Sequence, residues 1–313
     1  MFKVIKPGLL TTIQDLGRKG YQKYGVAVSG VADSYAHRIA NVLVQNPEDA
    51  ATLEITLLGP ELKALKSTTI AITGANLNPH INNKPVPMWS TITVKKGDRI
   101  HFKGYSSGCR AYLAVSGGFE GDNVLGSKST DLISQIGGKE GRSLERGDYI
   151  YTGNDGTLLK IPTRRRLIPT LIPTYSSNVT VRVILGPQED AFTEKGIHTF
   201  LNSEYTVSLD SDRMASRLHG PKIEHVKSAD IPSEGMFIGA IQVPKNGLPI
   251  LLQVGRQSIG GYTKIAGVIS VDLPKIAQLK PKDKITFKQV TLEEAQELLV
   301  KQEKLFTMWK ATI

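Results

Sequence analysis

Three polar segments of the sequence carry side chains that could bind an anion or move a proton. Residues 29–33 read Ser-Gly-Val-Ala-Asp and lead into a predicted helix, whose first amides and dipole favour a negative charge. On a predicted strand at 236–243, alternation places Gln242 on the same face as Met236 and Ala240, and a polar group that ends an apolar face is typical of a pocket rim. Residues 255–262 place Arg256 near a flexible glycine pair, so its guanidinium could bind a carboxylate or phosphate through two hydrogen bonds.

Each of these segments also has a purely structural explanation. Asp33 could simply cap the first turn of the helix, because an Asp at that position accepts a backbone N–H. Gln242 could be a solvated strand end, and residues 255–262 could merely turn a corner. The sequence leaves both explanations open for all three segments.

Residues 121–130 read Gly-Asp-Asn-Val-Leu-Gly-Ser-Lys-Ser-Thr and almost match a phosphate-binding P-loop. Lys128 comes one residue too late, and the flanking sequence lacks the strand-then-helix order that such a loop needs. We therefore interpret the segment as a turn-rich connection. A different phosphate site stays open, since four adjacent residues are suitable donors: Ser127, Lys128, Ser129 and Thr130.

The histidines and the cysteine are predicted to be structural. The six histidines contain no pair at the i, i+4 spacing that places two imidazoles on one helix face, so no metal site is predicted. The single cysteine, Cys109, excludes an intramolecular disulfide and indicates a reducing compartment. A catalytic thiol is disfavoured because no histidine lies nearby in the sequence to act as its base.

The composition is that of a folded, basic protein. Its 313 residues contain 39 Lys and Arg against 29 Asp and Glu, a formal net charge of +10. Apart from the run at 164–166 the basic residues are dispersed, and only 6% of residues are aromatic, so a nucleic-acid role is disfavoured. The charge instead predicts an acidic partner protein and an anionic substrate. With no signal peptide and no apolar run of ~18 residues, we expect a cytoplasmic protein without a membrane role.

Short alternating or β-branched runs dominate the sequence and predict a mainly β fold. Gly, Pro, Asn and Asp clusters bound these runs closely, which indicates antiparallel strands. Asn246-Gly247 is typical of a hairpin turn. Three turns, which contain Asp98, Asp148 and Asp283, each precede an alternating strand. This recurrence indicates that the two halves of the chain have similar folds. The predicted strands are residues 69–73, 91–94, 110–116, 180–185, 236–243 and 250–254.

Two helices and one linker complete the predicted architecture. Apolar residues recur at i, i+3, i+4 and i+7 over residues 33–46, and Thr291-Leu292-Glu293-Glu294 is a capping box. The proline-rich stretch 161–178 is predicted to be a linker. We therefore predict barrel-like β domains at residues 1–160 and 179–290, followed by a C-terminal helix at 291–313.

Taken together, these motifs resemble the biotin-dependent carboxyltransferase-like family over nearly the whole chain. That family includes a subunit of the bacterial ATP-dependent 5-oxoprolinase and half of the carboxyltransferase domain of urea carboxylase. The resemblance implies two cyclophilin-like β-barrel domains. It is carried by residues 7–18, 29–33, 53–56, 73–75, 110–118, 125–131, 186–188, 212–214, 239–244 and 260–262.

The resemblance also implies an enzyme subunit that is active only with its partners. The implied assembly contains a PxpB (KipI-like) subunit and a PxpA-like subunit, and it hydrolyses 5-oxo-L-proline to L-glutamate with ATP hydrolysis. ATP would bind this chain or a partner. The lactam is a poor electrophile, so ATP can activate its carbonyl oxygen as a phosphorylated intermediate. Attack by water then needs a base, and the substrate carboxylate needs a cation.

The positions that match the family's motifs are the expected site residues. The catalytic candidates are Ser29, Asp33 and Asp212, with either carboxylate as base or water-positioning group. The substrate-binding candidates are Arg213, Gln242, Arg256 and Tyr262. The chain departs from the family at Gly255, where relatives have Asp, and at Ala215, where they have Gly. The first departure removes a carboxylate that could act as a base or orient Arg256.

Two other functions stay open. One is a carboxyltransferase-type subunit that acts with a separate biotinylated carrier. The chain cannot carry biotin itself, because none of its five methionines adjoins a lysine, as the Met-Lys-Met acceptor motif requires. The other is a non-enzymatic antagonist that sequesters a KipI-like kinase inhibitor.

Overall fold

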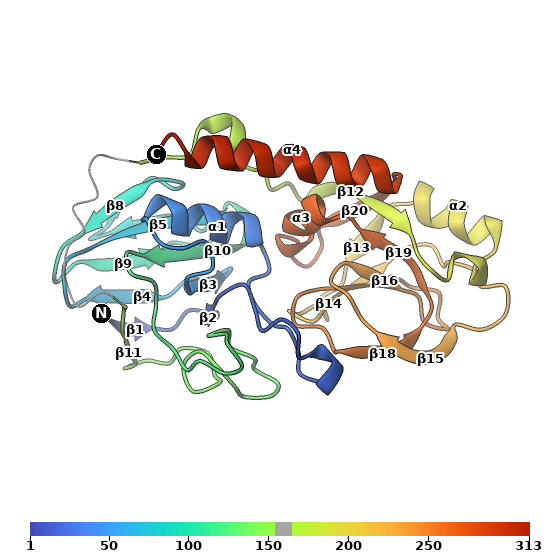
Figure 1. The fold of residues 1–313 in the computed structure, drawn as a ribbon, viewed down its shortest axis with the longest axis horizontal. Helices are drawn as coiled ribbons and strands as arrows, with labels where there is room; N and C mark the ends of the chain where they lie inside the picture. Colours follow the sequence, from blue (N-terminus) through green and yellow to red (C-terminus); the bar gives the residue numbers. More distant parts are fainter. Residues whose placement is uncertain (154–164) are drawn as a thin grey trace. The chain divides into compact units, whose positions relative to one another are not determined.

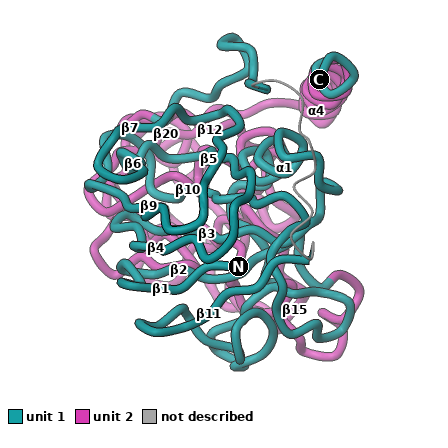
Figure 2. The backbone as a smooth tube through the Cα atoms, turned by 90° about the vertical axis from the view of Figure 1, so that its left-hand side faces the viewer, with its two compact units in different colours: residues 1–18, 29–175, 309–313 teal, residues 19–28, 176–308 magenta. Residues whose placement is uncertain are grey.

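The computed structural model describes residues 1–153 and 165–313, which divide into two compact units (Figures 1 and 2). Unit 1 contains residues 1–18, 29–175 and 309–313, and unit 2 contains residues 19–28 and 176–308. The predicted linker at 161–178 lies partly outside the described residues, as does Arg164 of the basic run.

Two antiparallel sheets build unit 1 around one apolar core (Figure 1). The first sheet has the order β11 (Tyr149–Ile150), β1 (Phe2–Lys6), β4 (Glu61–Ala64), β9 (Arg99–Phe102), β6 (Pro79–Ile81) and β7 (Lys84–Pro85). The second has the order β2 (Leu10–Gln14), β3 (Thr52–Thr56), β10 (Ser107–Val115), β5 (Thr68–Asn76) and β8 (Thr91–Val94). Helix α1 (Ser34–Leu43) packs on β5 and β10, where Thr73 Oγ1 donates to the carbonyl of Ala36 at 2.7 Å.

A closed barrel of seven strands forms unit 2, and a two-stranded ribbon accompanies it. The barrel has the order β12 (Asn178–Leu185), β19 (Lys264–Val268), β16 (Ala240–Gln242), β17 (Ile250–Leu252), β14 (Ala215–His219), β13 (Tyr205–Val207) and β20 (Lys284–Gln289). The ribbon pairs β15 (Asp230–Gly235) with β18 (Ile259–Tyr262). The helices are α2 (Glu194–Asn202), α3 (Leu273–Ala277) and the long α4 (Leu292–Lys310). The mainly β fold is confirmed.

Single turns of 3-10 helix join several of these elements. They are η1 (Gln22–Tyr24), η2 (Pro169–Leu171), η3 (Glu189–Ala191) and η4 (Ser270–Asp272). Among the described residues, no helix has both the length and the apolar character needed to cross a membrane.

The repeated Asp turns have one geometry in both units. In each, a carboxylate oxygen accepts the backbone N–H of the residue three positions earlier, at 2.8 to 3.1 Å: Lys95 to Asp98, Glu145 to Asp148, and Lys280 to Asp283. The turn then leads directly into β9, β11 or β20. This recurrence confirms the prediction that the Asp in each turn precedes a strand.

The predicted strand at 236–243 is wrong over its first half. Only Ala240–Gln242 forms a strand, because Gly239 has a φ of +83° and closes a turn in which Ala240 N donates to the carbonyl of Phe237. Strand alternation therefore does not link Met236 to Gln242, although Met236 still packs against Ala240 in a small apolar cluster.

Candidate functional site

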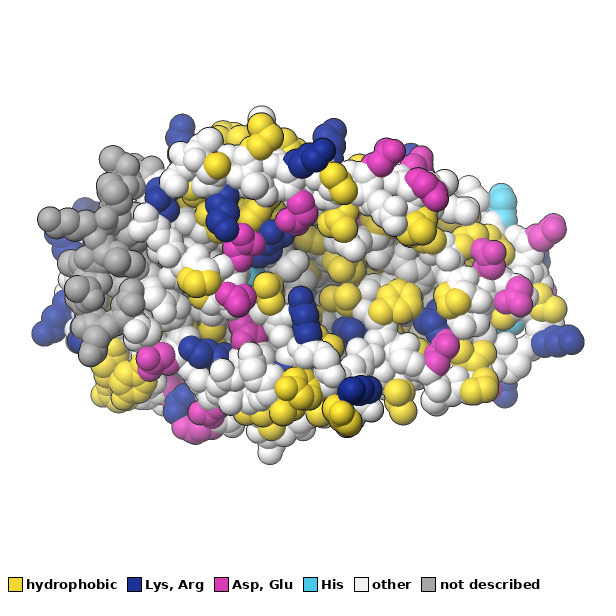
Figure 3. Space-filling model, viewed as in Figure 1, with side chains coloured by type: hydrophobic (Ala, Val, Ile, Leu, Met, Phe, Trp, Pro, Cys, Tyr) yellow, Lys and Arg dark blue, Asp and Glu magenta, His cyan; other side chains and the backbone are white. Residues whose placement is uncertain are grey.

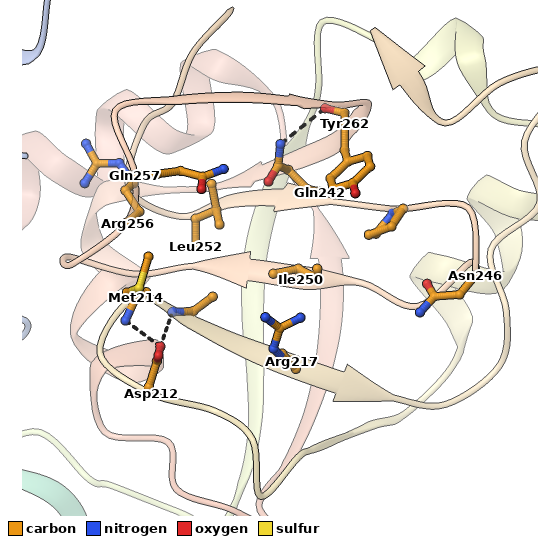
Figure 4. A pocket seen from close by; sticks show the side chains of 12 residues that line it. Asp212, Met214, Arg217, Gln242, Asn246, Ile250, Leu252, Arg256, Gln257 and Tyr262 are labelled. Carbon is orange, nitrogen blue, oxygen red and sulfur yellow. Dashed lines mark hydrogen bonds between the residues drawn. The ribbon is translucent and has the colours of Figure 1, made fainter. Parts of the chain in front are cut away.

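A pocket of about 410 Å³ lies on the outer face of the unit 2 barrel (Figure 4). Its wall consists of alternate residues of β14, β17 and β16, while the residues between them, such as Leu218 and Leu251, belong to the barrel core. The lining residues are Asp212, Met214, Ala215, Arg217, Gln242, Pro244, Asn246, Ile250, Leu252, Arg256, Gln257 and Tyr262.

The strand register arranges the pocket's polar groups in a row. Arg217 pairs with Ile250, Ile250 pairs with Gln242, and Gln242 pairs with Lys264. At a strand spacing of ~4.8 Å, the Cα atoms of Arg217 and Gln242 lie about 10 Å apart with Ile250 between them. Figure 4 shows the Arg217 guanidinium pointing toward Ile250. A small ligand with an anionic end and a polar end fits this spacing.

Lys264, the last residue of the row, is neutralised within unit 2. It is only 2% exposed and forms an ion pair with Glu234, and this hydrogen bond lowers the pKa of that carboxyl. Gln188 Nε2 donates to the same Glu234 oxygen at 3.0 Å. Lys264 is therefore occupied, and the cations that line the pocket are Arg217 and Arg256.

Arg256 is half-buried and its hydrogen-bond acceptor is neutral. Its Nε donates to the carbonyl of Met236 at 3.2 Å, and burial lowers the pKa of the guanidinium. Gln22 Nε2 donates to the same carbonyl at 2.7 Å. No carboxylate among the described residues forms an ion pair with Arg256. A partly desolvated cation of this kind gains stability when an anion binds.

Gln242 and Tyr262 close the pocket at its polar end. Gln242 is 2% exposed, and its Nε2 donates to the carbonyl of Tyr262 at 3.4 Å. A Cβ atom at Gly260 would lie 2.9 Å from this Nε2 and 3.1 Å from Met236 Sδ. Steric exclusion explains the glycine at position 260, because only a residue without a side chain lets β18 lie this close to Gln242.

Asp212 and Arg213 lie in the turn before β14, and only Asp212 lines the pocket. Asp212 is exposed, and its Oδ1 accepts the N–H groups of Met214 and Ala215 at 2.7 and 3.0 Å. A Cβ atom at Gly255 would lie 3.0 Å from the carbonyl oxygen of Arg213. An Asp at position 255 would therefore require a small shift of this turn.

Arg217 is a pocket residue that the sequence motifs did not single out. It lies two residues after Ala215 on β14, so strand alternation from the Asp-Arg-Met motif was the signal that could have found it. Its side chain is exposed and makes no hydrogen bond or ion pair with another described residue. It is the cation best placed to meet a ligand above Ile250 (Figure 4).

The other predicted site residues, Ser29 and Asp33, belong to unit 1. Ser29 is buried and its Oγ donates to the carbonyl of Thr130 at 2.9 Å. Asp33 is fully buried and caps α1: its Oδ1 accepts Ala36 N–H at 2.9 Å, and its Oδ2 accepts the hydroxyl of Tyr175 at 2.8 Å. The predicted cap is confirmed.

A buried network of hydroxyls and carboxylates surrounds this cap. The Tyr112 hydroxyl accepts Asp33 N–H at 2.8 Å and donates to Glu54 Oε2 at 2.9 Å. The same Glu54 oxygen accepts Ala32 N–H at 2.8 Å. Burial, and then the nearby carboxylates, raise the pKa of both Tyr112 and Tyr175 well above the ordinary value. Both phenols therefore stay protonated near neutral pH and act as hydrogen-bond donors.

Two substitutions of Asp33 separate a capping role from a catalytic one. We expect Asp33→Asn to keep most of the free energy of unfolding, since Asn caps helices as well as Asp does. Asp33→Ala should lose about 2 kcal/mol or more, because Ala36 N–H and the Tyr175 hydroxyl would both lack a buried partner. Urea unfolding measures both values. Turnover of the Asn variant in the assembled enzyme then tests the base role, which needs an ionised carboxylate.

The loop that resembles a P-loop is organised around an internal carboxylate. Asp15 accepts hydrogen bonds from Ser127 Oγ, Lys128 N–H and Ser129 Oγ, each at 2.6 Å. The Ser127 and Ser129 hydroxyls therefore already have an anionic partner, whereas Lys128 Nζ donates to the Phe119 carbonyl at 3.4 Å and Thr130 Oγ1 donates to the Ile13 carbonyl at 3.0 Å. Residues 121–130 form a turn at Leu125-Gly126 between isolated bridges, which agrees with the turn-rich connection predicted for this segment.

Metal ligation has no support in the described residues. They contain no group of three or more His, Cys, Asp or Glu side chains that could hold a metal ion. Cys109, the single cysteine, is buried.

Comparison with known proteins gives consistent relatives for the whole chain. The family model "Carboxyltransferase domain, subdomain A and B" matches residues 24–289. The chain is 35% identical to the 5-oxoprolinase subunit designated C in Haemophilus influenzae, over 93% of its length and 92% of that protein's. It is also 35% identical to the corresponding 5-oxoprolinase subunit of Escherichia coli, over 98% of the chain and 96% of that protein.

The solved structures point to the same group of proteins. The urea amidolyase of K. lactis superposes with a TM-score of 0.92 at 32% identity, covering 98% of this chain and 20% of that one. The urea carboxylase of Kluyveromyces lactis gives the same TM-score and identity, and the match covers 29% of its chain. These two enzymes are much longer than the segment that resembles this chain.

Proposed function

Because the chain belongs to the family of carboxyltransferase domains with subdomains A and B, we propose that it is the PxpC (KipA) subunit of an ATP-dependent 5-oxoprolinase. In this proposal it works with a PxpB-like (KipI-like) subunit and a PxpA-like subunit. The complex opens the lactam of 5-oxo-L-proline and releases L-glutamate, with ATP hydrolysed on this chain or on a partner.

The observation that carries the proposal is the pair of available arginines in the unit 2 pocket. Arg217 and Arg256 line a small cavity that also presents the amide of Gln242. 5-Oxoproline is a small anion with a carboxylate at one end and an amide at the other. The arginines can bind the carboxylate, and Gln242 and Tyr262 can orient the ring amide.

ATP hydrolysis makes lactam opening feasible in a stepwise reaction. The lactam oxygen attacks the γ-phosphorus of ATP and ADP leaves, which turns a poor electrophile into a good one. Water then adds to the activated carbon and the C–N bond breaks, with the nitrogen taking a proton, which leaves a glutamyl phosphate. A second water attacks this acyl phosphate and releases phosphate and L-glutamate. In this proposal the base that receives the proton of water is Asp212, the carboxylate that lines the pocket.

A second candidate function, carboxyl transfer, is favoured by one observation. The urea amidolyase and urea carboxylase matches superpose over nearly the whole chain. In that case a separate biotinylated protein would bring the carboxyl group, because this chain has no Met-Lys-Met acceptor. The pocket arginines would then bind the carboxylate of the carrier's cofactor.

Reconstitution tests the proposal directly. We expect glutamate formation from 5-oxo-L-proline, coupled to ADP release, only when the chain is mixed with its PxpB-like and PxpA-like partners. Arg256→Ala in the same mixture should raise KM for 5-oxoproline or lower turnover. An assembled complex that makes no glutamate but carboxylates a substrate from a biotinylated carrier would favour the second function. Tight binding of the KipI-like partner with no turnover of any kind would identify an antagonist.

A further inference from the structure

Gln22, a residue outside the pocket lining, forms two hydrogen bonds next to Arg256. Its Nε2 donates to the carbonyl of Met236 at 2.7 Å and to the carbonyl of Ser258 at 3.0 Å. A side-chain amide has two N–H donors, so these two bonds use both of them. Gln22 is half-buried in segment 19–28, which belongs to unit 2 although unit 1 residues precede and follow it (Figure 2).

Of the two carbonyls, one belongs to a fixed anchor and the other to the loop of Arg256. Met236 is 1% exposed and packs in a small apolar cluster of unit 2. Ser258 lies two residues after Arg256, in the segment between β17 and β18. Gln22 therefore ties this loop to the anchor.

Each carbonyl would keep a hydrogen-bond donor without Gln22. The Ser258 carbonyl accepts Met236 N–H at 3.0 Å, and the Met236 carbonyl accepts Arg256 Nε at 3.2 Å. Loss of the Gln22 amide would therefore leave neither carbonyl without a donor. It would remove the bridge that holds the two carbonyl dipoles together. Gln22 thus fixes the direction of Arg256 more than it stabilises unit 2.

The two Nη groups of Arg256 are left for a ligand. The Nε is used by the Met236 carbonyl, and neither Nη forms a hydrogen bond or ion pair with another described residue. Two Nη groups bind both oxygens of a carboxylate when the guanidinium and the carboxylate lie in one plane. A change in the direction of the guanidinium would therefore keep the positive charge near the pocket but lose this paired geometry.

Positive charge alone does not define a position for an anion on this chain. On the face of the molecule shown in Figure 3, Lys and Arg side chains are scattered and do not form one continuous patch. Long-range attraction by such a surface brings an anion near the protein but does not orient it. The direction of individual guanidinium groups in the pocket must supply the orientation.

We propose that Gln22 is a positioning residue for the anion site of the unit 2 pocket. By bridging the Met236 and Ser258 carbonyls, it holds Arg256 in the direction from which the two Nη groups bind a ligand carboxylate. The proposal rests on the proposed function for the identity of that ligand, 5-oxo-L-proline, whereas the hydrogen bonds of Gln22 do not depend on it. The sequence motifs did not single out Gln22, because its partners lie more than two hundred residues later.

NMR of the full chain tests the positioning without the reaction. The Arg256 Nε–H signal is assigned by its absence in Arg256→Lys, and its exchange with solvent reports how firmly the guanidinium is held. We expect exchange to be about tenfold faster in Gln22→Ala than in the wild type, because the carbonyl that accepts this N–H is held less firmly. Gln296→Ala, the same change at an exposed position of α4, should leave the rate unchanged. An unchanged rate in Gln22→Ala would overturn the proposal.

Kinetics of the assembled enzyme separate positioning from a general structural effect. Gln22→Ala should raise KM for 5-oxo-L-proline about tenfold and leave kcat within about twofold, because Arg256 holds the carboxylate and not the reacting carbon. The preference over 2-pyrrolidinone, which lacks the carboxylate, should fall by the same factor. A fall in kcat with KM unchanged, or an unchanged preference, would contradict the positioning role.

A second substitution, Gln22→Glu, keeps the size of the side chain and reverses its hydrogen bonding. A carboxylate cannot donate to the two carbonyls, and it would compete inside the protein for the Arg256 guanidinium. We expect KM to rise more than in Gln22→Ala. A Gln22→Glu enzyme with the wild-type KM would count against the proposal even if Gln22→Ala failed to fold.

Failure of the proposed function gives a different result from failure of this inference. If the wild-type complex forms no glutamate from 5-oxo-L-proline, the proposed function is wrong, and the exchange rates of the Arg256 Nε–H still decide the role of Gln22. If the wild type is active and both Gln22 variants have its KM, the proposed function stands and the positioning role is wrong.

Discussion

Replacing Arg217 by alanine is expected to lower kcat/KM of the assembled enzyme for 5-oxo-L-proline by roughly 100-fold. Arg217 lines the pocket and points toward Ile250 (Figure 4), and its side chain makes no hydrogen bond or ion pair with another described residue. A guanidinium that holds a carboxylate through two charge-assisted hydrogen bonds contributes about 3 kcal/mol, which corresponds to that factor. The loss should appear mainly in KM, because the carboxylate does not react.

Substrate analogues make this prediction specific for the carboxylate. 2-Pyrrolidinone has the same lactam ring without the acid, so the wild-type enzyme should strongly prefer 5-oxoproline and Arg217→Ala should lose most of that preference. The variant should remain folded because Arg217 is exposed. Lys222→Ala, an exposed cation outside the pocket lining, is the control. If Arg217→Ala leaves the preference intact while Arg256→Ala removes it, the carboxylate binds at Arg256 instead.

The second large effect is a loss of unit 1 stability below pH 6, caused by His37. This side chain is completely buried; its Nδ1 lies 2.9 Å from Thr52 Oγ1, and its Nε2 lies 3.3 Å from Asn41 Nδ2. Burial lowers the pKa of His37 to about 4, even though Asp15 and Glu54 act in the opposite direction. The folded state therefore holds this imidazole neutral.

The direction of the pH effect follows from proton binding. The unfolded chain takes up a proton on His37 as the pH falls through about 6.5, while the folded chain does so only near pH 4, so acid favours unfolding. From the two pKa values the free energy of unfolding should fall by about 2 kcal/mol at pH 5 and about 3 kcal/mol at pH 4 relative to pH 7.5.

Tryptophan fluorescence can follow this loss in unit 1 alone. The sequence contains two tryptophans, Trp89 and Trp309, and both are buried in unit 1. Urea unfolding at pH 7.5, 6 and 5 should show a steeper decline for the wild type than for His37→Gln, which cannot take up a proton. Equal declines would mean that other groups cause the acid sensitivity.

Local signals in the sequence predicted local structure well. The N-cap of Asp33, the capping box at Thr291 and the strand at 91–94 all depend on residues within four positions of one another, and each is confirmed. Helix α2 was missed because its nine residues include Gly196, which lowers helix propensity. The strand at 236–243 failed because a positive φ at Gly239 cannot be recognised from an alternating pattern.

The candidate site could be predicted only in part, because it is formed by contacts between residues that lie far apart in the sequence. Motifs singled out Arg213, but the register of β14 against β17 and β16 is what places Arg217 opposite Ile250 and near Gln242. The donors of the loop at 127–129 looked free because their partner, Asp15, lies more than a hundred residues earlier. Residue types alone could not show which charged groups were already paired.

The division of the chain between the units also constrains how the protein is made. Trp309 is buried in unit 1, and Lys310 forms an ion pair with Glu48 of the same unit at 2.7 Å. On the ribosome these residues emerge only after residues 176–308, so unit 1 cannot be completed until unit 2 has been synthesised. Unit 2 in turn includes residues 19–28, which are made before most of unit 1. Synthesis of the two units therefore overlaps, although each unit has its own core. Unit 1 is the first to begin and the last to be completed.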